Sequence, residues 1–173
     1  MPEQPAPARL FLALWPGPRM RQALAACRDS LPWPPGTVPT PTDKLHLTLH
    51  FIGGVPQQRL PELVAGLAAP VQPFELQLSL LDSWRGGVTV LRPASVPEPL
   101  LQLHADLAAA LHRQALPVEP RPYRPHVTLA RHGPGLPPAT IAATRAALRW
   151  RPTGYALVRS MTDGRYQVLA RWA

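Results

Sequence analysis

A short pattern that could support acid–base chemistry occurs twice in this chain. The first copy lies in "KLHLTLHFIG" and the second in "PHVTLARHG". Each copy has a histidine, a threonine, a leucine and a glycine at identical spacing, 80 positions apart: His46, Thr48, Leu49 and Gly53, then His126, Thr128, Leu129 and Gly133. One such histidine on a strand would usually be structural. Two copies with the same threonine offset indicate a functional pair.

Strand alternation predicts where the side chains of the first copy point. Successive residues of a strand face opposite sides of the sheet. His46, Thr48 and His50 are therefore expected on one face, with Leu49 and Phe51 on the other.

The second copy follows the same rule, with His126 and Thr128 on one face. Arg131 is a candidate ligand for a phosphate or ribose. Simple parity places it on the face opposite His126, unless the strand ends or bulges there.

Two imidazoles that face one cleft can act as a general acid and a general base. An unperturbed imidazole has a pKa of about 6.5, so both forms are populated near neutral pH. One ring removes a proton from water or a hydroxyl, and the other supplies a proton to the leaving oxygen. The two threonine hydroxyls could donate hydrogen bonds to the oxygens of a phosphate held between the histidines.

Two other kinds of site fit less well. His46 and His50 form an H-x-x-x-H pair, but along a strand they would lie roughly 13 Å apart, too far for one ion. No G-x-S-x-G motif is present to suggest a serine hydrolase. We expect no metal and no cofactor.

Composition predicts one globular domain over residues 1–173. The hydrophobic fraction is 46%, and 17 arginines and one lysine against 10 acidic residues give a net charge of +8. This balance favours a polyanionic partner such as nucleic acid or a nucleotide, although an arginine-rich proteome would look similar. We expect a monomer.

Cys27 is the only cysteine, which excludes a disulfide within the chain. The first residues contain no basic leader and only a short apolar run, so neither a signal peptide nor a membrane span is expected. A cytoplasmic location follows as a prediction.

Periodicity and proline punctuation predict alternating strands and helices. Strands are expected at 9–16, 44–53, 74–84, 86–93 and 123–131, and as a hairpin at 154–173 that turns at Asp163-Gly164. Helices are expected at 18–31, 56–70, 98–116 and 138–148, and the proline-rich stretch 32–42 as an irregular loop. The similar order in the two halves predicts an α+β fold with two pseudo-symmetric lobes. Each lobe would be a small, mainly antiparallel sheet backed by helices, with the active-site cleft between them.

The doubled motif resembles that of the 2H phosphoesterase superfamily, which is named for two H-x-[T/S]-x motifs. The chain is most similar to the bacterial and archaeal RNA 2′,3′-cyclic phosphodiesterases, once described as 2′-5′ RNA ligases. The matching pieces are "RLFLAL", "LHLTLHFIG", "FELQL", "PHVTLAR" and "LVRSMTDGRYQVLARW". They cover nearly the whole chain.

The resemblance implies metal-independent opening of an RNA terminal 2′,3′-cyclic phosphate to a 2′-phosphomonoester, with minor reverse 2′-5′ ligation. It implies that His46 is the general acid and His126 the general base, with Thr48 and Thr128 on the phosphate oxygens. The local sequence does not by itself order acid and base.

Four further residues are candidates for contacts with the base or ribose: Phe51, His50, Tyr123 and Trp33. Two alternatives stay open. One is a 2H enzyme for a small cyclic nucleotide or a 2′-5′ linkage, and the other is a nucleotide- or RNA-binding module without turnover.

Overall fold

The computed structural model describes residues 2–173. Its strands are β1 (Ala8–Leu14), β2 (Val38–Pro39), β3 (Leu47–Val55), β4 (Leu76–Trp84), β5 (Val88–Pro93), β6 (Val127–Arg131), β7 (Leu148–Trp150), β8 (Tyr155–Ser160) and β9 (Tyr166–Trp172). Its helices are α1 (Pro18–Asp29), α2 (Leu60–Gly66), α3 (Glu98–Arg113) and α4 (Pro138–Ala143), with 3₁₀ turns η1 (Thr42–Lys44) and η2 (Gln57–Arg59). None of the helices within residues 2–173 has the length and hydropathy needed to cross a membrane.

Proline sets where the helices of this chain begin. All four α-helices between residues 2 and 173 carry a proline in their first two positions. Proline is favoured there because its missing N–H would have no partner within the helix and its φ is already helical. Four of the 25 prolines therefore support the fold by starting helices.

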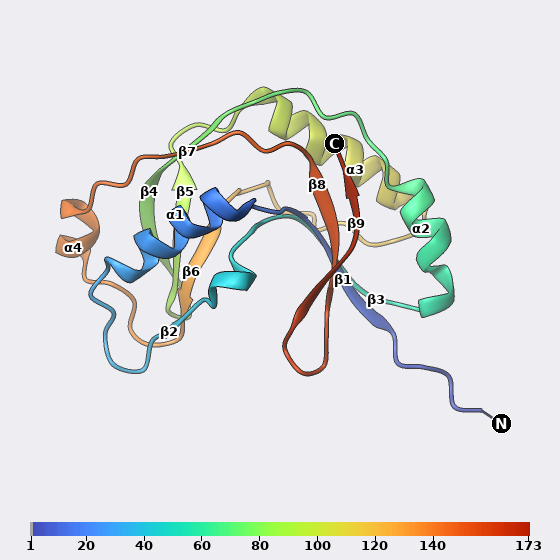
Figure 1. Cartoon of the computed structure of the whole chain (residues 1–173), viewed down its shortest axis with the longest axis horizontal. Helices are drawn as coiled ribbons and strands as arrows, with labels where there is room; N and C mark the ends of the chain where they lie inside the picture. Colours follow the sequence, from blue (N-terminus) through green and yellow to red (C-terminus); the bar gives the residue numbers. More distant parts are fainter. Residues whose placement is uncertain (1) are drawn as a thin grey trace.

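The strands form one antiparallel sheet in the order β7-β4-β5-β6-β3-β1-β8-β9, with β2 paired to β6. The strands that carry the two motifs, β3 and β6, meet in the middle through a single residue pair, Leu47 and Val127. This junction divides the eight strands of that order into two halves of four, with β2 as an additional short strand beside β6 (Figure 1). We call β3-β1-β8-β9 the first sheet half and β6-β5-β4-β7 the second. The predicted α+β class is confirmed.

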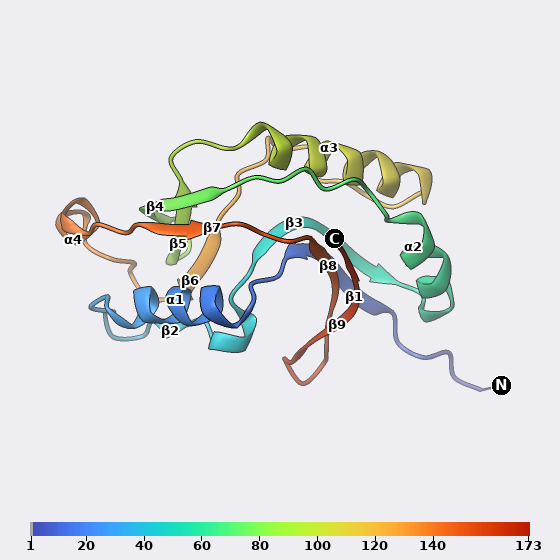
Figure 2. The same ribbon diagram turned by 45° about the horizontal axis from the view of Figure 1, so that its top comes forward.

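The two sheet halves do not correspond to the two halves of the chain. β1, near the start, pairs with β8, near the end, so the ends of the chain build one sheet half together. Helix α3 packs against β3, and α1 packs against β6 and β7. Figures 1 and 2 show α2 and α3 beside the first sheet half and α1 and α4 beside the second.

Strand β1 is buried on both faces. Leu10, Leu12 and Leu14 enter the main core, while Phe11 and Ala13 join a smaller cluster on the other face. Full burial of a leucine contributes about 1.5–3 kcal/mol. The main core also receives the apolar stripe of α3, whose members include Leu100, Leu103, Leu107 and Leu111. The smaller cluster lies under the site described below.

Two predicted elements differ from the structure. Val38 and Pro39, expected in an irregular loop, pair with Arg131 and Ala130 as the short strand β2. A proline is tolerated because β2 pairs only on one side, so one row of its backbone groups needs no partner. The predicted helix 138–148 ends at Ala143, and 148–150 pairs with β4 as β7 instead.

Candidate active site

The register of β3 and β6 brings the two motifs together. Leu47 opposes Val127 in an antiparallel pair. Residues that flank such a pair face each other in reverse order, so His46 lies across from Thr128, and Thr48 lies across from His126. All four line one groove of about 540 Å³. The two histidine strands therefore lie side by side.

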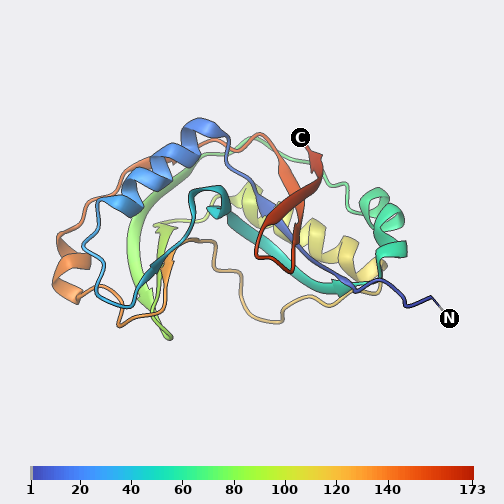
Figure 3. The same ribbon diagram turned by 60° about the horizontal axis from the view of Figure 1, so that its bottom comes forward.

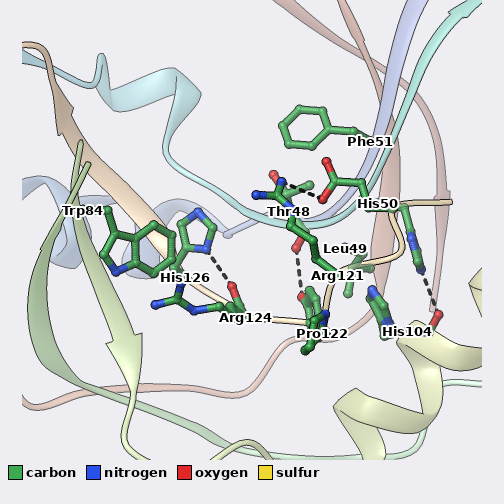
Figure 4. Close-up of a pocket in the computed structure, with 12 residues that line it drawn as sticks. Thr48, Leu49, His50, Phe51, Trp84, His104, Arg121, Pro122, Arg124 and His126 are labelled. Carbon is green, nitrogen blue, oxygen red and sulfur yellow. Dashed lines mark hydrogen bonds and ion pairs between the residues drawn. The ribbon is translucent and has the colours of Figure 1, made fainter. Parts of the chain in front are cut away.

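Both imidazoles are oriented by the same local hydrogen bond. Nδ1 of His46 donates to the carbonyl of Lys44 at 2.6 Å, and Nδ1 of His126 donates to the carbonyl of Arg124 at 2.7 Å. A carbonyl can only accept, so Nδ1 carries the proton and Nε2 has a free lone pair in the neutral ring. Figure 4 shows the His126 bond. In each motif, the carbonyl two residues before the histidine therefore fixes the imidazole tautomer with the proton on Nδ1.

His46 lies in an aromatic enclosure. Its ring centroid is 4.9 Å from that of Phe11, 5.7 Å from that of Trp15 and 5.7 Å from that of Tyr166. Its Nε2 is 3.0 Å from Thr48 Oγ1, which can donate to it. Burial lowers the pKa of His46 to about 4, and nearby positive charges, that of Arg21 first among them, act in the same direction.

His126 is enclosed differently. Its ring meets the indole of Trp84 edge-on at 4.5 Å, and the guanidinium of Arg124 lies 4.3 Å from that indole. Burial holds the pKa of His126 below its usual value, and the charges of Arg131 and Arg124 add to this effect. Both rings therefore favour the neutral form near pH 7 before an anion binds. An anionic phosphate between them would raise both pKa values, because an opposite charge favours the protonated form.

A matched β-bulge follows the threonine in each motif. In β3, Thr48 and His50 oppose consecutive residues of β1, which leaves Leu49 as the extra residue. In β6, Thr128 and Ala130 oppose consecutive residues of β5, which leaves Leu129 extra. An extra residue reverses the alternation of the side chains after it.

The bulges change the sides predicted for three residues. Phe51 and Arg131, expected on the opposite face from the histidines, both line the groove, and Phe51 is 57% exposed. His50, expected beside His46 and Thr48, is buried on the other side and donates from Nε2 to the carbonyl of His104 at 2.8 Å. Strict alternation beyond the threonine was thus wrong. The β-bulge that was given above as the exception for Arg131 is present in β6.

The groove continues into a second cavity of about 410 Å³, which Figure 4 shows from close by. The two share a boundary that includes Thr48, His126 and Phe51. Lys44 lines the groove, and Arg121 lines both the groove and the second cavity. The arrangement can hold an anion between two imidazoles and two hydroxyls.

Comparison with known proteins agrees with this geometry. The family model of the 2′-5′ RNA ligase superfamily matches residues 17–164. The chain belongs to this superfamily. The predicted identity, a 2H phosphoesterase, is confirmed, as is the prediction of an enzyme of the phosphodiesterase type.

Two curated relatives of this 2H phosphoesterase carry the name RNA 2′,3′-cyclic phosphodiesterase. The Thermus thermophilus protein is 31% identical over 166 residues, which cover 88% of this chain and 81% of the relative. The Escherichia coli protein is 30% identical over 172 residues, which cover 96% of this chain and 97% of the relative.

Solved structures show the same fold. The apo form of Escherichia coli LigT is 28% identical, with a TM-score of 0.82 and 98% of each chain covered. LigT complexed with 3′-AMP is 29% identical, with a TM-score of 0.80 over 96% of this chain and 98% of that one.

A stack of three rings packs against β3 of this 2H phosphoesterase on the side where His50 is buried. His50 stacks on His104 at 4.0 Å, and His104 stacks on Tyr123 at 3.9 Å. The Tyr123 hydroxyl donates to the carbonyl of Thr48 at 2.8 Å, and burial holds its pKa far above the ordinary value. Tyr123 and His50 therefore hold the bulged strand in place, although both border the second cavity.

The stack makes the stability of the protein depend on pH. Burial lowers the pKa of His104 to about 4, with the charge of His50 a further cause. An unfolded chain has the usual value of about 6.5 and binds the proton more readily. Stability present above pH 6.5 is therefore lost as the pH falls toward 4.

We expect His104→Phe, which keeps a stacking ring but cannot titrate, to weaken this dependence. The unfolding free energy from urea titration should fall less between pH 7.5 and pH 4.5 than in the wild type. His112→Phe, at an exposed site on the same helix, should lose as much stability as the wild type. An equal loss in His104→Phe and the wild type would contradict this role of the stack.

Trp33 lies away from the groove and the second cavity. Its Nε1 donates to the carbonyl of Arg28 at 2.9 Å, and its ring packs against the main core. It anchors the proline-rich loop.

The sequence prediction missed the aromatic residues around the histidines: Phe11, Trp15, Trp84 and Tyr166. Phe11 and Trp15 had a usable signal, since they share one face of the first predicted strand. Tyr166 had none, because it reaches the site through the pairing of β9 with β8 and of β8 with β1. The tip of this hairpin points toward η1 (Figure 3), where Lys44 Nζ lies 5.1 Å from the Tyr166 ring.

Proposed function

We propose that this protein hydrolyses the terminal 2′,3′-cyclic phosphate of RNA to a 2′-phosphomonoester. One observation carries the proposal: two imidazoles with the same Nδ1 anchor lie in one groove, each across from the threonine of the other motif. Such a pair offers a base and an acid to one phosphate held between them. The names of the two relatives at about 30% identity and the 3′-AMP complex of LigT support RNA ends as the substrate class.

The reaction needs a base that removes a proton from water and an acid that gives a proton to the leaving 3′ oxygen. Nε2 of neutral His126 removes a proton from a water molecule as the water oxygen bonds to phosphorus. The bond from phosphorus to the 3′ oxygen breaks, and the protonated Nε2 of His46 gives its proton to that oxygen. The proton left on His126 then returns to His46 through solvent, which restores the pair.

The negative charge of the bound phosphate favours the protonated imidazole that the reaction needs. Burial keeps both rings neutral before the substrate binds, and the bound anion favours the proton on one of them. Hydroxyl donors from Thr48 and Thr128, with the guanidinium of Arg131, stabilise the charge that grows on the non-bridging oxygens.

Phe51 is proposed to stack on the base of the terminal nucleotide. Its ring is exposed at the edge of both cavities, and an aromatic face accepts any base, at about 1–3 kcal/mol for each stack. We expect Phe51→Ala to raise KM roughly 10-fold with little change in kcat. Steady-state kinetics with a cyclic-phosphate oligonucleotide would measure this, and an equal KM would contradict the stacking role. Leu101→Ala, exposed on α3 and outside both cavities, is the control.

The same site fits one related substrate and one reverse reaction. A small cyclic nucleotide would fill a groove of about 540 Å³, within the range of ordinary ligand pockets. The reverse reaction joins a 5′-hydroxyl to the cyclic phosphate in a 2′-5′ linkage. We expect it to be minor in water, which competes with that hydroxyl.

The test is a panel of three substrates: an RNA oligonucleotide ending in a 2′,3′-cyclic phosphate, adenosine 2′,3′-cyclic phosphate, and a 2′-5′-linked dinucleotide. The proposal predicts the highest kcat/KM for the oligonucleotide. A higher value for either small compound would overturn RNA ends as the preferred substrate. Recovery of every ligand unchanged after overnight incubation would instead identify a binding module without turnover.

A further inference from the structure

The geometry points to Arg21 on helix α1 as a positioning residue for His46. Arg21 does not line the groove, so it is not placed to touch a bound substrate. Its guanidinium donates from Nη1 to the carbonyls of Thr42 and Leu45, at 2.8 Å and 2.9 Å, and from Nη2 to the carbonyl of Pro16 at 3.4 Å. A planar guanidinium can bind several acceptors at fixed angles.

The two Nη1 bonds hold the segment that orients the His46 ring. Thr42 and Leu45 bracket Lys44, and the carbonyl of Lys44 accepts the Nδ1 proton of His46. A shift of this segment would move the carbonyl that fixes the tautomer and direction of the imidazole. A misplacement of about 1 Å at a reacting group can cost roughly 10²-fold in rate.

Arg21 also reaches His46 by a second route. Its guanidinium lies 4.9 Å from the ring centroid of Trp15, and Trp15 stacks on His46 at 5.7 Å with an interplanar angle of 28°. The Arg21 guanidinium, the Trp15 indole and the His46 imidazole thus form one continuous stack. The charge of Arg21 adds to the burial that lowers the pKa of His46.

A second arginine of α1 extends the same support to the other motif. Arg28 follows Arg21 by seven residues, two helical turns, so both lie on one face of the helix. Its Nη1 donates to the carbonyl of Thr40 at 2.6 Å and to Thr42 Oγ1 at 3.0 Å. Thr40 in turn donates from Oγ1 to the carbonyl of Thr128 at 2.9 Å. Helix α1 therefore fixes the segment that leads into β3 and that also contacts β6 through Thr40.

The test compares Arg21→Met and Arg21→Lys with a control, Arg19→Met, at an exposed arginine of the same helix. The activity part rests on the proposed function, so it is paired with a measurement that does not. That measurement is NMR of the His46 ring in ¹⁵N-labelled protein, assigned with His46→Gln. It reports the Nδ1 proton and the pKa of the ring.

We expect Arg21→Met to lower kcat roughly 10- to 100-fold, with KM within about twofold of the wild type. The Nδ1–H signal of His46 should weaken, because the carbonyl of Lys44 that accepts its proton is no longer held in place. Arg21→Lys keeps the positive charge but loses the planar guanidinium, whose donors bind several carbonyls at fixed angles. It should therefore also weaken the Nδ1–H signal of His46 and lower kcat, and it remains informative if Arg21→Met does not fold.

Wild-type NMR behaviour of His46 in both Arg21 variants would overturn the positioning role, whatever the activity. A changed His46 ring in a protein whose wild type turns over no cyclic phosphate would uphold the positioning and overturn the proposed function instead.

Discussion

Replacing either histidine of the doubled motif is expected to abolish most of the turnover. His46→Ala and His126→Ala should each lower kcat on a cyclic-phosphate oligonucleotide by about 10²–10⁴, the usual contribution of a positioned acid or base. The reason lies in the geometry: the two Nε2 atoms serve one groove from opposite motifs. Neither ring can replace the other, because each is locked by its own carbonyl.

The double variant should be scarcely slower than either single one. Residues that act as a unit have strongly non-additive effects on rate, and a pair with one member missing no longer passes a proton across the phosphate. His112→Ala, exposed on α3, removes a histidine far from the groove and should keep wild-type rates. Full activity in both motif variants would mean that the doubled histidines are structural.

Removing the threonine hydroxyls is expected to have the next largest effect. Thr48→Val and Thr128→Val keep the size and the β-branch that suits a strand but cannot donate a hydrogen bond. Loss of one donor to a growing negative charge costs about 10²–10³ in kcat. We expect losses near the lower end of that range for each, because the other threonine and Arg131 remain.

The serine variants Thr48→Ser and Thr128→Ser are the matched controls, since they keep the hydroxyl and lose only a methyl group. Single-turnover kinetics should place them within about tenfold of the wild type. Serine variants as slow as the valine variants would show that the threonines act through packing. Unchanged rates in the valine variants would remove both hydroxyls from the mechanism.

The sequence was sufficient to identify the doubled motif because its signal is local. Residue spacing alone placed His46 with Thr48, and His126 with Thr128, on one face of each strand, and the structure agrees up to each threonine. Beyond that point the prediction failed, because a bulge at Leu49 or Leu129 is defined by the register of the neighbouring strand. Leucine itself gives no sign of an extra residue.

The rest of the site depends on contacts between distant parts of the chain. Trp15 and Tyr166 reach His46 from the first and last strand regions, and no periodicity links them. The low pKa of His46 comes mainly from burial, which only the assembled site provides. Likewise, the hydrogen bonds of Arg21 become visible only once α1 and η1 are packed together.

The fate of one oxygen atom distinguishes paired acid–base hydrolysis from other reactions at this site. An RNA oligonucleotide ending in a 2′,3′-cyclic phosphate is incubated with the wild-type protein in ¹⁸O-labelled water that contains EDTA. Mass spectrometry and a 3′-specific phosphatase then identify the product. Paired acid–base hydrolysis predicts a 2′-phosphate that carries one ¹⁸O atom and resists the phosphatase. A 3′-phosphate, or turnover that requires a metal ion, would contradict the account.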